Sequence, residues 1–93
     1  MIKSFADGDT EALANRRLSR RWPREVQVAA LRKLRMLEAA ERLEDMRVPP
    51  GNRLEKLSGS RAGQYSIRVN DQWRICFNWW EGEAHDVELC DYH

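Results

Sequence analysis

The 93-residue sequence has few cysteines and no long apolar run. Its two cysteines, Cys76 and Cys90, lack the spacing of zinc ligands and are too few for a disulfide framework. No apolar run approaches the roughly 18 residues that a membrane helix needs. The first residues carry one cation and a very short apolar stretch, unlike a secretory signal. These absences predict a cytoplasmic protein in a reducing compartment, without a membrane partner.

Well-known catalytic and metal-binding motifs are also missing. The sequence has no P-loop, no GxGxxG, no HExxH and no GxSxG. A metal site could draw on the few available ligands, which are Cys76, His85, Cys90, Asp91 and His93. Strand alternation, however, puts His85 out of phase with both cysteines, so one strand face does not gather them. We therefore expect no metal and treat the cysteines as small packing residues.

What is present suits one small globular domain over residues 1–93. Hydrophobic residues make up 42% of the chain and charged residues 33%. A chain of this length buries only about 60–65% of the surface that its unfolded form exposes. We found no internal repeat and no low-complexity segment that would divide it.

A net charge of +1 hides strong segregation along the chain. Residues 16–35 hold eight Lys and Arg against one Glu, whereas residues 75–93 hold five acids and no Lys or Arg. Residues 51–74 carry five cations and two acids. The basic blocks are consistent either with solvated helix faces or with a local positive field that attracts an anionic partner.

The first half of the sequence favours helices. A short strand is predicted over residues 2–5, followed by a helix that Asp9 or Thr10 caps and that ends near Arg16 and Arg17. A longer helix is predicted over residues 22–45, with Pro23 in its first turn. Its apolar stripe consists of Val26, Ala30, Leu34 and Leu37. Prolines 49 and 50 must end it.

The second half predicts an antiparallel meander of strands over residues 64–69, 73–79 and 85–89. A three-residue loop over 70–72 would pair Ile67 with Ile75, whereas a two-residue loop would set Ile67 against Arg74. The same reasoning predicts a second loop over residues 80–82, in which Gly82 takes the position that needs a positive backbone angle. His85 is then in phase with the apolar residues of the last strand. The fold class is therefore α+β, with two N-terminal helices on one face of the sheet and solvent on the other.

This register sets Arg68 opposite Arg74 on the face away from the helices. Like charges opposite one another are unfavourable, and Glu88, expected opposite Arg74 on the next strand, would offset part of the repulsion. One interpretation is an Arg–Glu ladder. The other is an anion site, because paired guanidinium groups match phosphate oxygens.

Several stretches resemble the HigB branch of the RelE/ParE-like bacterial toxins. They are "IKSF", "LEDMRVPPGNRLEKLSGSRAGQYSIRVNDQWRICFNW" and the terminal "DYH". The resemblance covers essentially the whole chain. It implies a RelE-like fold and a ribosome-dependent endoribonuclease that cuts mRNA in the A site without a metal or other cofactor. It also implies a cognate helix-turn-helix antitoxin of the HigA type.

The same resemblance implies roles for individual residues. Glu55, where some relatives carry His, would be the general base, Arg74 would brace the phosphate, and His93 would be the acid. Tyr92 would stack on a base or orient the phosphate, and Asp91 would orient His93. The expected substrate contacts are Arg53, Lys56, Arg61 and Arg68. The expected contacts to ribosomal RNA are Arg16, Arg17, Arg20, Arg21 and Arg24.

Three alternatives stay open from the sequence. On its own, Glu55 is typical of a surface salt bridge. The terminal triplet is typical of a frayed chain end. The cationic sheet face could bind RNA or a peptide without cutting. The ParE branch shares the architecture but acts on DNA gyrase, for which the terminal triplet has no evident use.

Overall fold

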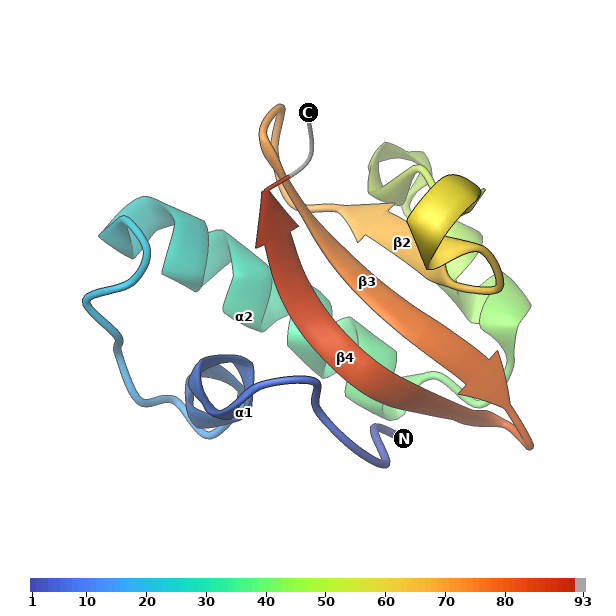
Figure 1. Cartoon of the computed structure of the whole chain (residues 1–93), viewed down its shortest axis with the longest axis horizontal. Coiled ribbons are helices and arrows are strands. Elements are labelled where there is room, and N and C mark those ends of the chain that lie inside the picture. The colour runs from blue at the N-terminus through green and yellow to red at the C-terminus, as the bar shows by residue number, and fades with distance from the viewer. Residues whose placement is uncertain (92–93) are drawn as a thin grey trace.

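Two α-helices pack against one face of a four-stranded antiparallel sheet in the computed structural model, which describes residues 1–91 (Figure 1). The strands lie side by side in chain order. The α+β prediction is confirmed. The elements are α1 (Gly8–Ala14), α2 (Arg24–Ala39), η1 (Leu43–Arg47), η2 (Pro50–Asn52), β1 (Glu55–Lys56), η3 (Gly59–Arg61), β2 (Tyr65–Arg68), β3 (Trp73–Trp80) and β4 (Glu83–Asp91).

Both helices begin or end at residues other than those predicted. Asp7, not Asp9 or Thr10, caps α1, and its side chain accepts a 2.7 Å hydrogen bond from the Thr10 N–H. The long helix ends at Ala39 instead of residue 45. The chain turns there because the Asp45 carboxylate accepts the N–H groups of Glu41 and Arg42, which starts η1 instead. These bonds lower the pKa of Asp45.

The main core lies between α2 and the sheet. The predicted stripe of α2, made of Val26, Ala30, Leu34 and Leu37, is buried, so this prediction is confirmed. It packs with apolar side chains of the strands in one cluster, to which the sheet contributes Ile67, Ile75, Phe77, Ala84, Val87 and Leu89. This packing fixes the sheet against the helices, since burying apolar surface is the main source of stability.

The β2–β3 register is as predicted. Ile67 pairs with Ile75, and Arg68 pairs with Arg74, across the loop of residues 70–72. The sequence pattern did not reveal β1, whose two residues are too few to show alternation, so the meander has four strands and not three. Through β1, Glu55 pairs with Ser66 at the edge of the sheet.

The second hairpin corrects the prediction of a three-residue loop. Its loop is Glu81–Gly82, because Trp80 pairs with Glu83, and both loop residues have positive φ angles of 54° and 74°. Two positive φ values are typical of a tight type I′ turn. The positive backbone angle expected at Gly82 is confirmed.

A bulge in β4 adds a second shift of register. Asp86 has φ of 53°, and the pairing is irregular between Cys76 and Asn78. Glu88 therefore faces Cys76 instead of the predicted Arg74. The bulge also breaks the alternation, so His85 pairs with Asn78 and stacks on Trp80 at 3.6 Å, out of phase with the core residues of β4. The predicted phase of His85 is wrong for this reason.

The N-terminal residues run parallel to β4 without forming the predicted continuous strand. Isolated bridges join Ile2 to Ala84 and Phe5 to Val87. Between them, the Asp86 N–H donates to Ser4 Oγ at 2.9 Å, so the bulge interrupts the ladder. The segment covers the outer edge of β4 (Figure 1).

The face of the sheet away from the helices is covered near its centre, which corrects the prediction of a solvent-exposed face. The segment that follows β1 folds back over it, and Leu57 packs there with Cys76 and Cys90 in a second small cluster. Arg74 and Ser66 on this face are only 6% and 0% exposed. Among the described helices, none is long and apolar enough to cross a membrane.

Candidate active site

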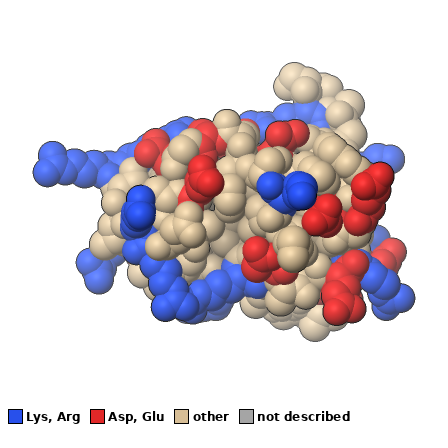
Figure 2. Space-filling model, turned by 90° about the horizontal axis from the view of Figure 1, so that it is seen from below, with Lys and Arg blue, Asp and Glu red and all other residues tan. Residues whose placement is uncertain are grey.

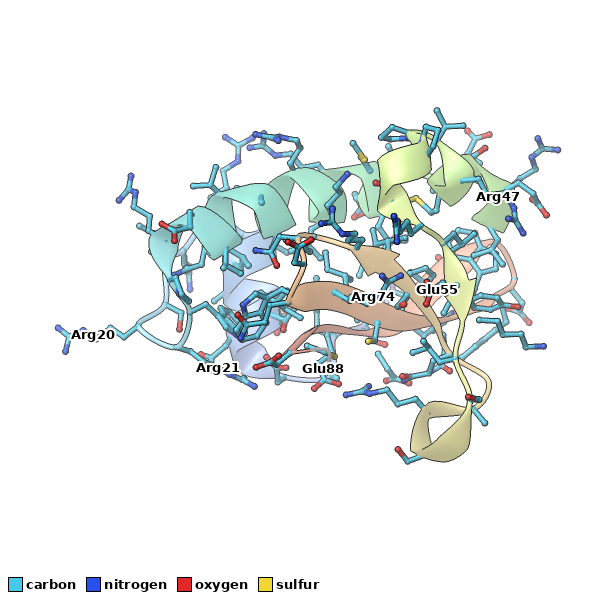
Figure 3. All side chains as sticks on the ribbon, turned by 90° about the horizontal axis from the view of Figure 1, so that it is seen from above. Arg20, Arg21, Arg47, Glu55, Arg74 and Glu88 are labelled. Atoms are coloured by element: carbon cyan, nitrogen blue, oxygen red, sulfur yellow. The ribbon has the colours of Figure 1, made fainter. Side chains whose placement is uncertain are left out.

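Strand β1 brings Glu55 toward Arg74 of β3. Glu55 Oε2 lies 3.9 Å from Arg74 Nη2, and Figure 3 shows the two side chains near one another over the sheet. The Glu55 side chain is 47% exposed, whereas that of Arg74 is only 7% exposed. Two residues that are distant in the sequence, Glu55 and Arg74, thus lie close together. The pair joins an accessible carboxylate to a cation whose position is fixed.

Arg74 is held by acceptors on two neighbouring segments. Its Nε donates to Ser66 Oγ at 2.7 Å, and its Nη2 donates to the carbonyl oxygens of Arg53 at 2.7 Å and Ser66 at 3.3 Å. A buried cation is stable only where hydrogen bonds replace its lost hydration. These bonds replace the water that the Arg74 guanidinium loses where it lies buried near Glu55 and opposite Arg68.

An open cleft of about 370 Å³ begins at Glu55. Its other lining residues are Lys56, Leu57, Ser58, Ser60, Arg61 and Asp91. The lining combines two cationic side chains with two carboxylates and two hydroxyls, so the cleft offers a polar ligand both hydrogen-bond donors and acceptors. Ser58 and Ser60 were missed as candidates because loop serines carry no distinctive sequence signal.

Arg61 joins the cleft to strand β4. Its Nη1 donates to Glu88 Oε1 at 3.2 Å and to Gln64 Oε1 at 3.0 Å. Burial of the guanidinium opposes its charge, but the hydrogen bond to Glu88, the interactions with the Cys90 and Cys76 thiols and the charge of Glu88 together outweigh burial and raise the pKa of Arg61. Glu88 thus neutralises Arg61 instead of Arg74, as the corrected register requires.

The remaining predicted site residues fall into three groups. Asp91 lies at the end of β4 in the cleft wall, where its Oδ2 accepts a hydrogen bond from Gln72 Nε2 at 3.1 Å. Arg53 contributes its backbone carbonyl to Arg74, while Arg68 forms an ion pair with Asp71. The predictions for Tyr92 and His93 lie outside the described residues.

The five arginines predicted to contact ribosomal RNA lie in and beside the α1–α2 connection, and Arg21 also lines a hollow together with Arg61 and Asp91 of the cleft. Arg16, Arg17, Arg20 and Arg24 are exposed. Arg21 is partly occupied, since its Nη1 lies 3.4 Å from Asp9 and its guanidinium stands 5.0 Å from the Trp22 ring. Figure 3 shows Arg20 extending from one end of the molecule, and long cationic side chains also project there in Figure 2.

The two cysteines form a contact between thiols under the site. Both are buried and free, and the hydrogen bond between them lowers the pKa of Cys76 and raises that of Cys90. Their burial with Leu57 fits the predicted packing role. Within residues 1–91, no group of three or more His, Cys, Asp or Glu side chains is arranged to hold a metal ion.

Comparisons with known proteins place the chain in a family. A family model described as "RelE-like toxin of type II toxin-antitoxin system HigB" matches residues 3–93. "Toxin HigB-1" of Vibrio cholerae is 48% identical over 67 residues, which span 72% of this chain and 70% of that protein. "Endoribonuclease HigB" of Proteus vulgaris is 42% identical over 41 residues, which span 44% of this chain and 45% of that protein.

Solved structures agree on the fold. The chain resembles one in the "YoeB-YefM complex from Staphylococcus aureus" with a TM-score of 0.61 at 15% identity, over 100% of this chain and 98% of that one. A heterotetrameric YoeB–YefM complex from the same organism gives a TM-score of 0.59 at 14% identity. At these identities the likeness concerns the fold alone.

Proposed function

Given that this chain belongs to the family of RelE-like HigB toxins of type II toxin–antitoxin systems, we propose that it is a ribosome-dependent endoribonuclease that cuts mRNA in the A site. The observation that carries the proposal is the Glu55–Arg74 pair at the edge of a cleft with Lys56 and Arg61. Relatives include a protein named as an endoribonuclease. The toxin inhibits translation and growth by destroying messages.

The reaction needs no metal or covalent enzyme intermediate. The 2′-oxygen of one nucleotide attacks the adjacent phosphorus while the bond from phosphorus to the 5′-oxygen breaks. A base takes the 2′ proton and an acid protonates the leaving 5′-oxygen, which yields a cyclic phosphate and a free 5′-hydroxyl. Negative charge grows on the phosphate oxygens between them, so a fixed cation lowers the barrier.

The residues divide these tasks. Glu55 is the base, because its carboxylate is exposed beside the cleft and accepts protons. Arg74 supplies the fixed positive charge, while Lys56, Arg61, Arg53 and Arg68 contact substrate phosphates. His93 is the acid, which Asp91 orients, and Tyr92 stacks on a base or orients the phosphate.

Two macromolecular partners follow from this proposal. The exposed arginines of the α1–α2 connection, Arg16, Arg17, Arg20 and Arg24, bind phosphates of ribosomal RNA, with Arg21 in a lesser role. An antitoxin of the helix-turn-helix, HigA-like type binds the toxin and blocks its activity. Both structural neighbours were solved as YoeB–YefM complexes, which supports a protein partner.

The test is cleavage of a labelled message on translating ribosomes by the wild type and by His93→Ala. The wild type should yield fragments at codon-linked positions, with cyclic phosphate ends and 5′-hydroxyl ends, and His93→Ala should cut ~10²–10⁴-fold more slowly. Fragments with 5′-phosphate ends would contradict the 2′-hydroxyl mechanism. Ribosome binding without fragments would favour a non-catalytic module, and DNA damage without message cleavage would favour a gyrase inhibitor.

A further inference from the structure

Ser66 helps to set the orientation of Arg74. It is 0% exposed and supplies two acceptors to the guanidinium, its hydroxyl to Nε and its carbonyl to Nη2. The hydroxyl bond is the shorter of the two at 2.7 Å. Hydrogen bonds on both Nε and Nη2 fix the plane of a guanidinium, because rotation about its last side-chain bonds would break them.

The Arg53 carbonyl, a further acceptor for Arg74, is held equally firmly. Arg53 has φ of 44°, a left-handed conformation in which its carbonyl accepts the Arg74 Nη2 hydrogen at 2.7 Å. The preceding Asn52 is completely buried, and its side chain donates to the carbonyl oxygens of Met46 at 3.2 Å and Val48 at 3.3 Å. The turn that presents the Arg53 carbonyl is therefore a rigid part of the fold.

A substitution of Ser66 can remove its hydroxyl group, which accepts the Arg74 Nε hydrogen bond, but not its backbone carbonyl. The backbone carbonyls of Ser66 and Arg53 remain whatever side chain follows them, so they keep Nη2 in place. Loss of the hydroxyl would leave the buried Nε hydrogen without its acceptor. The guanidinium could then rotate about Nη2, which would change the direction in which its Nε and Nη1 groups face.

We propose that Ser66 is a positioning residue for phosphodiester cleavage, because its hydroxyl sets the angle at which Arg74 presents its charge to the scissile phosphate. This inference rests on the proposed endoribonuclease function and assigns a residue that does not line the cleft. A cation oriented before the reaction stabilises the transition state without reorganisation. Ser66 itself touches neither substrate nor the reacting atoms.

The first test compares Ser66→Ala with Cys76→Ala in single-turnover cleavage on ribosomes. Cys76 faces Ser66 directly across β2 and β3 and is equally buried, so its truncation controls for loss of packing. Ser66→Ala should lower the cleavage rate roughly 10- to 100-fold with KM little changed. Cys76→Ala should stay within about twofold of the wild type. Equal losses in both variants, or none in Ser66→Ala, would overturn the inference.

A double-mutant cycle separates positioning from general damage. Because Ser66 acts through Arg74, Ser66→Ala should cause no further loss in an Arg74→Ala background. If the fold-losses in cleavage rate of the two single variants multiplied in the double variant, the inference would be overturned.

A measurement that does not depend on catalysis separates a failure of this inference from a failure of the proposed function. The NMR signal of the Arg74 Nε–H group should exchange slowly in the wild type and in Cys76→Ala and faster in Ser66→Ala. Unchanged exchange in Ser66→Ala would overturn the anchoring step by itself. A wild type that never cuts messages would overturn the proposed function and this inference with it, whereas an active wild type beside a fully active Ser66→Ala would overturn the inference alone.

Discussion

The Gln27 side chain and the Ser19 backbone exchange two hydrogen bonds. Gln27 Nε2 donates to the Ser19 carbonyl at 2.7 Å, and the Ser19 N–H donates to Gln27 Oε1 at 2.9 Å. The same Nε2 also donates to the Trp22 carbonyl at 2.7 Å. Gln27 is 3% exposed. A single buried amide on α2 therefore fixes the arginine-rich connection that precedes the helix.

Replacing Gln27 with methionine should destabilise the protein. Methionine keeps the approximate size of the side chain but leaves the backbone groups of Ser19 and Trp22 without their partners. We expect a loss of about 1–3 kcal/mol in the free energy of unfolding, measured by urea denaturation. Val28→Ala is the control, since Val28 is its exposed neighbour and should change stability little. Equal stability of Gln27→Met and wild type would contradict this role.

The arginines of this connection should differ in their effect on ribosome binding. Arg20→Ala should weaken binding and make the plot of log K against log salt concentration shallower by roughly one, because the variant neutralises one phosphate fewer. Its thermal stability should stay unchanged because the Arg20 side chain is exposed.

Arg21→Ala is the matched comparison, because Arg21 pairs with Asp7 and Asp9 of the α1 region. It should change the salt slope less and lower stability slightly, since exposed ion pairs contribute ~0–1 kcal/mol. Filter binding at several salt concentrations and thermal melts measure both quantities. Identical salt slopes for the two variants would refute the division of roles.

The parts of the fold that were predictable are those where a repeating pattern meets a buried surface. The stripe of α2 and the pairing of Ile67 with Ile75 were correct because any other register would expose apolar side chains. The predicted register was wrong where a single backbone angle sets the pairing of the strands. The positive φ of Asp86 shifts the pairing by one residue, and nothing in the residue type at that position announces a bulge.

The candidate site was partly predictable for a different reason. The resemblance to the family selected Glu55 and Arg74, and the structure brings them together. Residue spacing could not show that Arg74 is buried, because this follows from the way the chain around Leu57 covers this face of the sheet. Strand alternation places Ser66 on the same face of the sheet as Arg74, but its importance depends on a bond to Arg74 that the sequence does not reveal.

The tight β3–β4 turn predicts a stabilising substitution. Glu81 adopts φ of 54°, which is unfavourable for most side chains but tolerated by asparagine. Glu81→Asn should therefore raise the free energy of unfolding by roughly 0.5–1 kcal/mol, because Asn-Gly is a preferred type I′ pair. Glu81→Gln removes the same charge without relieving the backbone and serves as the control. Equal unfolding midpoints for the two variants would show that charge, and not backbone conformation, matters there.

Glu55 provides the sharpest test of the chemistry. Glu55→Gln preserves the shape of the side chain but cannot accept the 2′ proton, so single-turnover cleavage should slow by ~10²–10⁴-fold. Ribosome binding and the unfolding midpoint should change little, because the side chain is about half exposed and its ion pair with Arg74 is long at 3.9 Å. Glu44→Gln neutralises an exposed carboxylate of η1 and should cleave like the wild type. If Glu55→Gln also cleaves like the wild type, the base is another group, and the Glu55–Arg74 pair holds the cleft together without taking part in proton transfer.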